Sequence, residues 1–180
     1  MSRFSYHMIQ SPVGWIALLG RERGLVRLSL KPTPHEALEE LGPEVEEAEN
    51  DPSSFKEVLS CLERYMEGDA GALDEIELDL SNAPPFFSAA WEACRRIPSG
   101  ETRSYAWLAA EAGSPLAVRA AGQAMARNRF PLIIPCHRVI ASDGDLRGYG
   151  AGGLGVKAEL LERERAGAAK SSRSRGAGSR

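Results

Sequence analysis

The sequence contains few cysteines: Cys61, Cys94 and Cys136 are the only three among its 180 residues. An odd number of widely spaced cysteines argues against a disulfide framework and favours a reducing compartment, so we expect a cytoplasmic protein. The sequence also lacks a Cys-x-x-Cys pair or a paired Cys/His cluster, and His7 and His35 form no recognisable ligand set with Cys61. We therefore expect neither a zinc site nor a cofactor.

Long hydrophobic runs are absent as well. Residues 131–135 form a run of five apolar residues, far short of the about 18 to 20 that a membrane span needs. The N-terminus has no basic stretch followed by a continuous apolar segment, so we expect no signal peptide. With 43% hydrophobic and 26% charged residues, the composition is typical of a soluble globular protein, and we expect no membrane partner.

Charge is distributed unevenly, although the formal net charge is only −3. Residues 1–85 contain 7 Lys and Arg against 17 Asp and Glu, whereas residues 86–180 contain 15 against 8. This asymmetry indicates that the second half contacts a polyanion. The change of sign coincides with a Pro-rich break at residues 81–85. We therefore predict an α/β domain over residues 1–83, a helical domain over 84–166 and a disordered basic tail over 167–180.

The acidic half reads as strands followed by helix. Residues 4–30 contain apolar, partly alternating segments separated by two turns, which predicts a β-meander with one buried face. Residues 34–49 show only a weak helical pattern. A break at residues 50–54 precedes apolar residues at helical spacing up to about Glu67, and alternation at residues 76–80 is consistent with one more strand.

The basic half reads as short helices. Apolar residues from Phe87 to Ile97 share one helical face. A helix over residues 102–113 and another over 116–128, with Ser114 as N-cap and Pro115 at the first helical position, fit a helix-turn-helix. A last helix is expected from Leu154 to about Ala166. Two short helices joined by a Gly-containing turn are compatible with DNA binding.

The strongest chemical signal is the sequence Pro135-Cys136-His137-Arg138. A thiol is a useful nucleophile as thiolate, and a histidine can take its proton. Neighbouring side chains on an extended chain point apart, so a water between Cys136 and His137 is one way to connect them. Cys61 and Cys94 lie on apolar helical faces and are expected to be inert core residues.

This segment resembles the active-site signature of the O6-alkylguanine-DNA alkyltransferases, and further motifs follow in the family's order. The resemblance is strong over residues 84–166 and weaker over 4–80. It implies a ribonuclease-H-like N-terminal domain and a winged-helix-like C-terminal domain. The matching motifs are Phe86-x4-Trp91, Ile97-Pro98-x-Gly100-Glu101-Thr102-x-Ser104-Tyr105, Val118-Arg119-Ala120-x-Gly122-x-Ala124-Met125-x-x-Asn128, Pro131-x-Ile133-Ile134-Pro135-Cys136-His137-Arg138-Val139-Ile140, Gly144, Gly148-Tyr149 and Lys157-x6-Glu164.

The resemblance implies a DNA repair protein that reacts once. Cys136 is then the acceptor, whose thiolate attacks the alkyl carbon on guanine O6 and keeps the alkyl group as a thioether. His137 takes the thiol proton through a water. Glu164 hydrogen-bonds the other imidazole nitrogen and fixes its tautomer. Asn128 braces the active-site turn.

The resemblance also implies a double-stranded DNA partner that carries O6-alkylguanine, bound by a monomer. Tyr105 donates to N3 of the flipped base, and Arg119 enters the duplex at the vacated place. The backbone near Val139 and Ser142 contacts the purine edge and O6. Four further positions are implied to contact DNA or the base: Ser114, Met125, Arg138 and Tyr149.

The sequence departs from the family pattern in a few places. Residues 149–153 carry one more Gly or Ala than many members have before the final helix, which bears on the wall of the alkyl pocket. Phe87 and Ala106 stand where polar residues are common.

Three alternatives remain open from the residues alone. A non-catalytic alkyl-lesion binder of the same fold typically has Trp at the cysteine position, which Cys136 argues against. A helix-turn-helix regulator with an acidic sensory domain leaves the Pro-Cys-His-Arg segment unexplained. A Cys-His hydrolase of small acyl compounds needs neither Arg119 nor the basic second half.

Overall fold

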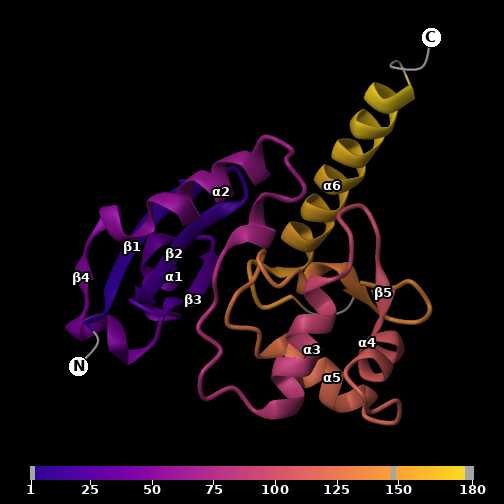
Figure 1. The fold of residues 1–180 in the computed structure, drawn as a ribbon, viewed down its shortest axis with the longest axis horizontal. Coiled ribbons are helices and arrows are strands. Elements are labelled where there is room, and N and C mark those ends of the chain that lie inside the picture. Colours follow the sequence, from indigo (N-terminus) through magenta and orange to yellow (C-terminus); the bar gives the residue numbers. More distant parts are fainter. Residues whose placement is uncertain (1–2, 147–148, 177–180) are drawn as a thin grey trace.

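The computed structural model describes residues 3–146 and 149–176, with a sheet-and-helix part followed by a helical part (Figure 1). The N-terminal sheet has the strand order β3-β2-β1-β4. Strands β1 (Ser5–Ser11), β2 (Gly14–Arg21) and β3 (Gly24–Lys31) pair antiparallel, which confirms the predicted meander. The two-residue strand β4 (Glu49–Asn50) pairs parallel to β1 and is too short to leave a sequence pattern.

The central strand β2 is buried on both faces, so the prediction of a single buried face is wrong. Ile16 and Leu18 belong to the large hydrophobic cluster on the side of helix α2 (Lys56–Met66). Ala17 and Leu19 pack in a second cluster on the side of helix α1 (Pro34–Glu39). Because successive side chains of a strand point to opposite faces, the unbroken apolar run of β2 fits a sheet that is covered twice.

The alternating residues 76–80 do not form a regular strand. Leu78 forms only an isolated parallel bridge with Leu25, supported by hydrogen bonds of 3.1 Å from Leu25 N to Glu77 O and 2.8 Å from Asp79 N to Leu25 O. This segment thus follows the sheet edge for one bridge and then turns away. The 3-10 turns are η1 (Pro43–Glu47), η2 (Pro52–Phe55) and η3 (Ala72–Glu75).

The C-terminal part is mainly helical. Its elements are α3 (Pro85–Arg95), β5 (Arg103–Ser104), α4 (Tyr105–Glu111), α5 (Val118–Ala126), η4 (Cys136–Arg138), β6 (Val139–Ile140) and α6 (Gly153–Gly176). The Ser104 side chain caps α4 by accepting from Trp107 N at 3.0 Å. The predicted helix-turn-helix is present as α4 and α5, and β5 pairs parallel to β6.

The start of α5 differs from the prediction. Ser114 does not cap the helix and Pro115 is not its first residue, because Ala117 N donates to Ser114 O at 2.8 Å and closes a turn there. Ala117 occupies the N-cap position, without a side-chain cap. The turn leaves Leu116 99% exposed beside the helix start.

Helix α6 also differs, since it continues past Ala166 to Gly176 and projects beyond the rest of the fold (Figure 1). The prediction of a disordered tail is therefore wrong for residues 167–176. Alanines and Lys170 have high helix propensity, which favours continuation of the helix without an apolar face. Residues 177–180 lie outside the described residues.

The two parts share one hydrophobic core. A single cluster joins β2 and β3 to helices of both parts, and Leu28 N donates to Arg129 O at 2.9 Å across the junction. The α/β fold class with a sheet-and-helix domain before a helical domain is confirmed. The domain boundary at residue 83 stays a prediction. Among the described residues, no helix is both long and apolar enough to cross a membrane.

Leu62 tests the packing of α2 against the sheet, because its side chain is 1% exposed. We expect Leu62→Ala to lower the free energy of unfolding in urea by about 2 to 5 kcal/mol, since it leaves a cavity in the core. The exposed neighbour Glu63→Ala should change it by less than about 0.5 kcal/mol. Equal effects of the two substitutions would contradict this packing.

Candidate active site

The turn before Cys136 is held by Asn128. Asn128 Nδ2 donates to Ile134 O at 2.8 Å, and Asn128 Oδ1 accepts from Phe130 N at 2.9 Å. Leu132, between them, has a left-handed φ of 74°. The backbone then tightens into η4, with Cys136 N donating to Ile134 O at 2.7 Å. Asn128 thus bonds to both sides of this turn.

Cys136 is a buried thiol with 8% of its surface exposed. Burial raises the pKa of the Cys136 thiol, while a hydrogen bond with Asn128 and the charge of Lys157 lower it in part. The group therefore rests as a thiol at neutral pH. A nucleophilic reaction at this sulfur then needs a base that removes the proton.

His137 is fully buried, and its Nε2 lies 2.6 Å from Glu164 Oε1. Burial works to raise the pKa of Glu164, but hydrogen bonds and charges of His137 and Arg138 outweigh it and lower the pKa to about 2. Glu164 is therefore a carboxylate that only accepts hydrogen bonds, so Nε2 carries the hydrogen. The lone pair of the neutral ring is then on Nδ1.

Nδ1 of His137 is buried and has no hydrogen-bond partner among the described residues. It is the nitrogen that can accept a proton, directly or through a water. Burial lowers the pKa of His137, and Glu164 acts in the opposite direction. The ring is consequently neutral at neutral pH, which is the state that a general base requires.

Arg138 lies inside the protein. Its Nε donates to Glu164 Oε2 and one terminal nitrogen to Glu164 Oε1, both at 2.9 Å, and the other terminal nitrogen donates to Ile97 O at 2.6 Å. With 6% of the residue exposed, all three guanidinium nitrogens donate to protein acceptors. Arg138 as a DNA contact stays a prediction, and in this structure its charge is paired with Glu164.

Lys157 brings a second buried cation to the site. It is 1% exposed, and its Nζ donates to Val139 O at 2.9 Å. Burial lowers the pKa of Lys157, while the Cys136 and Cys94 thiols raise it. The carbonyl of Val139, which the resemblance placed near the purine, thus accepts a bond within the protein. A positive charge near the sulfur favours the thiolate during the reaction.

A small cavity of about 50 Å³ reaches Cys136 from the surface between β3 and the end of α5. Met125, Gly150 and Ala151 are among its lining residues. Lys31 of β3 donates to Gly150 O at 2.8 Å. The segment with the additional Gly or Ala thus lies against the N-terminal sheet and beside Cys136. Gly148, part of one motif, lies outside the described residues.

Tyr149 is buried behind this cavity. Its ring meets the His137 ring edge-on, with 6.4 Å between the ring centroids. The hydroxyl has no hydrogen-bond partner among the described residues, and burial raises its pKa. Tyr149 therefore packs on the imidazole in this conformation. The following turn needs glycine at Gly152, where φ is +91° and a Cβ would lie 2.8 Å from Val156 Cγ2.

The remaining predicted DNA-contacting residues lie around α4 and α5. Arg119 is exposed in the first turn of α5, and Ser114 is exposed in the turn before it. Tyr105 is half-buried at the start of α4. Ser142 is exposed in the loop after β6.

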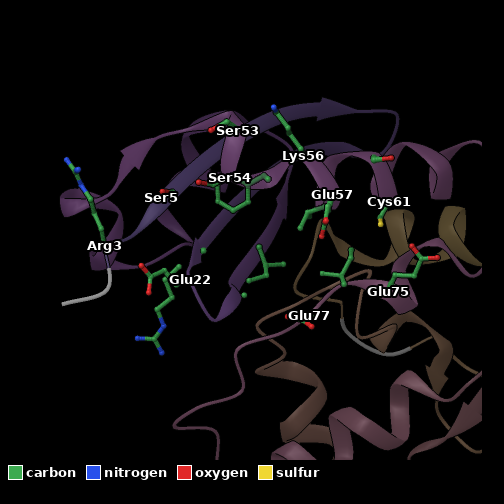
Figure 2. A pocket seen from close by; sticks show the side chains of 18 of the residues that line it. Arg3, Ser5, Glu22, Ser53, Ser54, Lys56, Glu57, Cys61, Glu75 and Glu77 are labelled. Atoms are coloured by element: carbon green, nitrogen blue, oxygen red, sulfur yellow. The ribbon is translucent and has the colours of Figure 1, made fainter.

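A second, broader groove lies in the N-terminal part, with a volume of about 1050 Å³ (Figure 2). It is lined by β-strand residues, η2 and α2, and Cys61 reaches it. Burial raises the pKa of the Cys61 thiol, and no histidine is among its lining residues. This groove therefore lacks the base that accompanies Cys136. Cys94 is buried in the core, where burial raises its pKa further.

Sequence reasoning also missed a contact that reaches the site from the N-terminal part. The Tyr65 hydroxyl, from α2, donates to Glu164 Oε1 at 2.8 Å. The helical spacing of Tyr65 marked it as a core residue, and its hydroxyl was the available signal, since a buried phenol usually has a hydrogen-bond partner.

Comparison with known proteins agrees with this geometry. The sequence matches the ribonuclease-like domain of 6-O-methylguanine DNA methyltransferase over residues 4–80 and the DNA-binding domain over residues 85–166. A methylated-DNA–protein-cysteine methyltransferase of Methanosarcina barkeri is 40% identical over 160 residues, covering 88% of this chain and 96% of that protein. A constitutive one of Bacillus subtilis is 38% identical over 161 residues, covering 89% and 94%.

The fold comparison gives the same result. The crystal structure of the Mycobacterium tuberculosis protein OGT in complex with DNA superposes with a TM-score of 0.76 and 36% sequence identity, covering 91% of this chain and 94% of that one. The chain belongs to the family of 6-O-methylguanine DNA methyltransferases.

Proposed function

We propose that this protein repairs DNA by moving an alkyl group from O6 of guanine to its own Cys136, in a single irreversible step. The observation that carries the proposal is the buried Cys136 thiol next to a His137 whose Nε2 is held by Glu164. A helix pair of the type that binds DNA stands beside this site. The family membership of the chain supports the same reaction.

The transfer begins with proton removal from the thiol. His137 Nδ1 accepts the Cys136 proton through a water, and Glu164 stabilises the imidazolium that forms. The thiolate then attacks the alkyl carbon, forming the S–C bond as the C–O bond breaks. The electron pair of that bond stays on the guanine, which takes up a proton as it leaves. The product is a stable thioether, so each molecule reacts once.

The alkylated base must leave the duplex before it reaches a buried sulfur. Arg119 is exposed at the start of α5, next to the 99% exposed Leu116. An exposed cation and an exposed apolar side chain at one helix end suit insertion at a base step in the minor groove. Tyr105, Met125, Tyr149 and the backbone near Ser142 are the groups that we assign to the flipped base, with Ser114 on the DNA backbone.

We further propose that the partner is double-stranded DNA carrying O6-alkylguanine and that the protein acts as a monomer. The basic excess of residues 86–180 supports binding of phosphate groups. The narrow cavity at Cys136 and the neighbouring residues 149–153 are the features that set which alkyl groups fit.

Cys136→Ala tests the acceptor. We expect it to abolish transfer from a methylated duplex oligonucleotide while DNA binding is retained, because only the sulfur is removed. In mass spectrometry of the unsubstituted protein, the peptide with Cys136 should gain one methyl group per lesion repaired. The matched control Cys61→Ala should react like the unsubstituted chain.

The same measurement separates the alternatives. Catalytic turnover without modification of the protein would indicate a hydrolase, and lesion binding without loss of the methyl group would indicate a non-catalytic binder. Transfer that persists in Cys136→Ala would refute the assignment of the acceptor.

Glu164→Gln tests the role of the carboxylate. The amide oxygen can still accept from His137 Nε2, but the negative charge that raises the pKa of His137 is lost, so His137 becomes a weaker base. We expect the single-turnover rate to fall by about 100-fold or more. Glu162→Gln, an exposed position of the same helix, is the control and should keep the rate. Circular dichroism verifies that both variants are folded, and an unchanged rate in folded Glu164→Gln would contradict this role.

Arg119→Ala tests the helix that enters the duplex. We expect transfer at sub-saturating DNA to slow by about tenfold, the effect of losing one contact worth roughly 1.4 kcal/mol. Arg23→Ala removes the same charge from the exposed β2–β3 turn and should have little effect. If both variants slowed transfer equally, Arg119 would act only through net charge.

A further inference from the structure

The acid of the active site has a hydrogen-bond donor from the other domain. Tyr65 lies on α2, and its hydroxyl donates to Glu164 Oε1 at 2.8 Å across 99 residues of sequence. The residue is 8% exposed. The accepting oxygen is the one that lies 2.6 Å from His137 Nε2. The phenol and the imidazole therefore share one carboxylate oxygen.

We propose that Tyr65 is a positioning residue of the transfer reaction, which fixes the Glu164 carboxylate against His137 and sets how readily His137 accepts the thiol proton. This inference rests on the proposed function, since it concerns the same proton transfer. It gives the N-terminal domain a part in the chemistry.

The hydrogen bonds on the Glu164 carboxylate explain why the neutral Tyr65 hydroxyl affects His137. Oε1 accepts from His137, Arg138 and Tyr65, and Oε2 accepts from Arg138. Arg138 is itself held by a hydrogen bond to Ile97 O. Tyr65 competes directly with His137 for electron density on Oε1, so it moderates the attraction between Glu164 and the imidazolium.

Other polar groups around His137 are present in both the native protein and a Tyr65 variant. The charged groups that act on His137 are Arg138 of η4 and Lys157 and Glu164 of α6. Cys94 of α3, Cys136 of η4 and Tyr149 before α6 interact with these groups or with one another, and Arg163 of α6 acts on Tyr65. A change at Tyr65 alone leaves all of these in place.

The direction of the effect follows from the shared oxygen. Tyr65→Phe removes the hydroxyl and keeps the ring, so Oε1 becomes a stronger acceptor for His137. The imidazolium is then stabilised and the pKa of His137 rises. Since the base must be neutral to take the thiol proton, the rate is lost at a higher pH than in the unsubstituted protein. We expect the acid limb of the pH–rate profile to move up by about one pH unit.

The experiment measures single-turnover transfer from a methylated duplex at saturating DNA over a range of pH, with the full chain. Tyr6→Phe, in β1 of the same domain, is the matched control and should keep the native profile. A substitution that only weakens packing changes thermal stability or the plateau rate without moving the acid limb. An acid limb of Tyr65→Phe that coincides with the native one overturns the proposal.

A second variant keeps the test valid if Tyr65→Phe does not fold. Site-specific 3-fluorotyrosine at position 65 retains the hydroxyl and makes it a more acidic, stronger donor, so the acid limb should move to lower pH. An unmoved limb, or an upward shift, contradicts the inference. If the unsubstituted protein repairs DNA and leaves Cys136 unmodified, the proposed function fails. If Cys136 is modified but the Tyr65 variants have the same pH–rate profile as the unsubstituted protein, this inference alone fails.

Discussion

The rest of the site depends on the hydrogen bonds that hold the buried Glu164 carboxylate. A charge inside a protein is tolerated only when its oxygens are saturated by donors. Here the donors come from His137 and Arg138 in one short turn and from Tyr65 in the N-terminal domain. The same contacts that stabilise the buried charge hold the imidazole in one tautomer and one orientation. Removing any donor therefore affects both the fold and the chemistry.

Burial of Cys136 has a complementary effect. It raises the pKa of the thiol, so the sulfur rests protonated and of low reactivity, although Asn128 and Lys157 favour the thiolate. His137 is buried as a neutral ring with Nδ1 available. The site thus combines a protonated thiol with a neutral imidazole whose Nδ1 has no hydrogen-bond partner among the described residues.

The N-terminal domain supports this site at several points. Besides Tyr65, Lys31 of β3 binds the carbonyl of Gly150 next to the cavity, and Leu28 binds the carbonyl of Arg129 before the active-site turn. One hydrophobic cluster continues from the sheet into the helices of the C-terminal part. The sheet is thus part of the frame that fixes the position of Cys136.

The sequence by itself determined the local elements: the meander, the helix pair, and the Cys136 segment, whose motifs also indicated the family. Only the tertiary structure decided which side chains of the site hydrogen-bond to one another. It buried Arg138 on Glu164, and it placed the Tyr65 hydroxyl on the same carboxylate. The physical reason is distance along the chain. Periodicity and capping act within a few residues, whereas the pairing of a buried charge depends on which helices pack together.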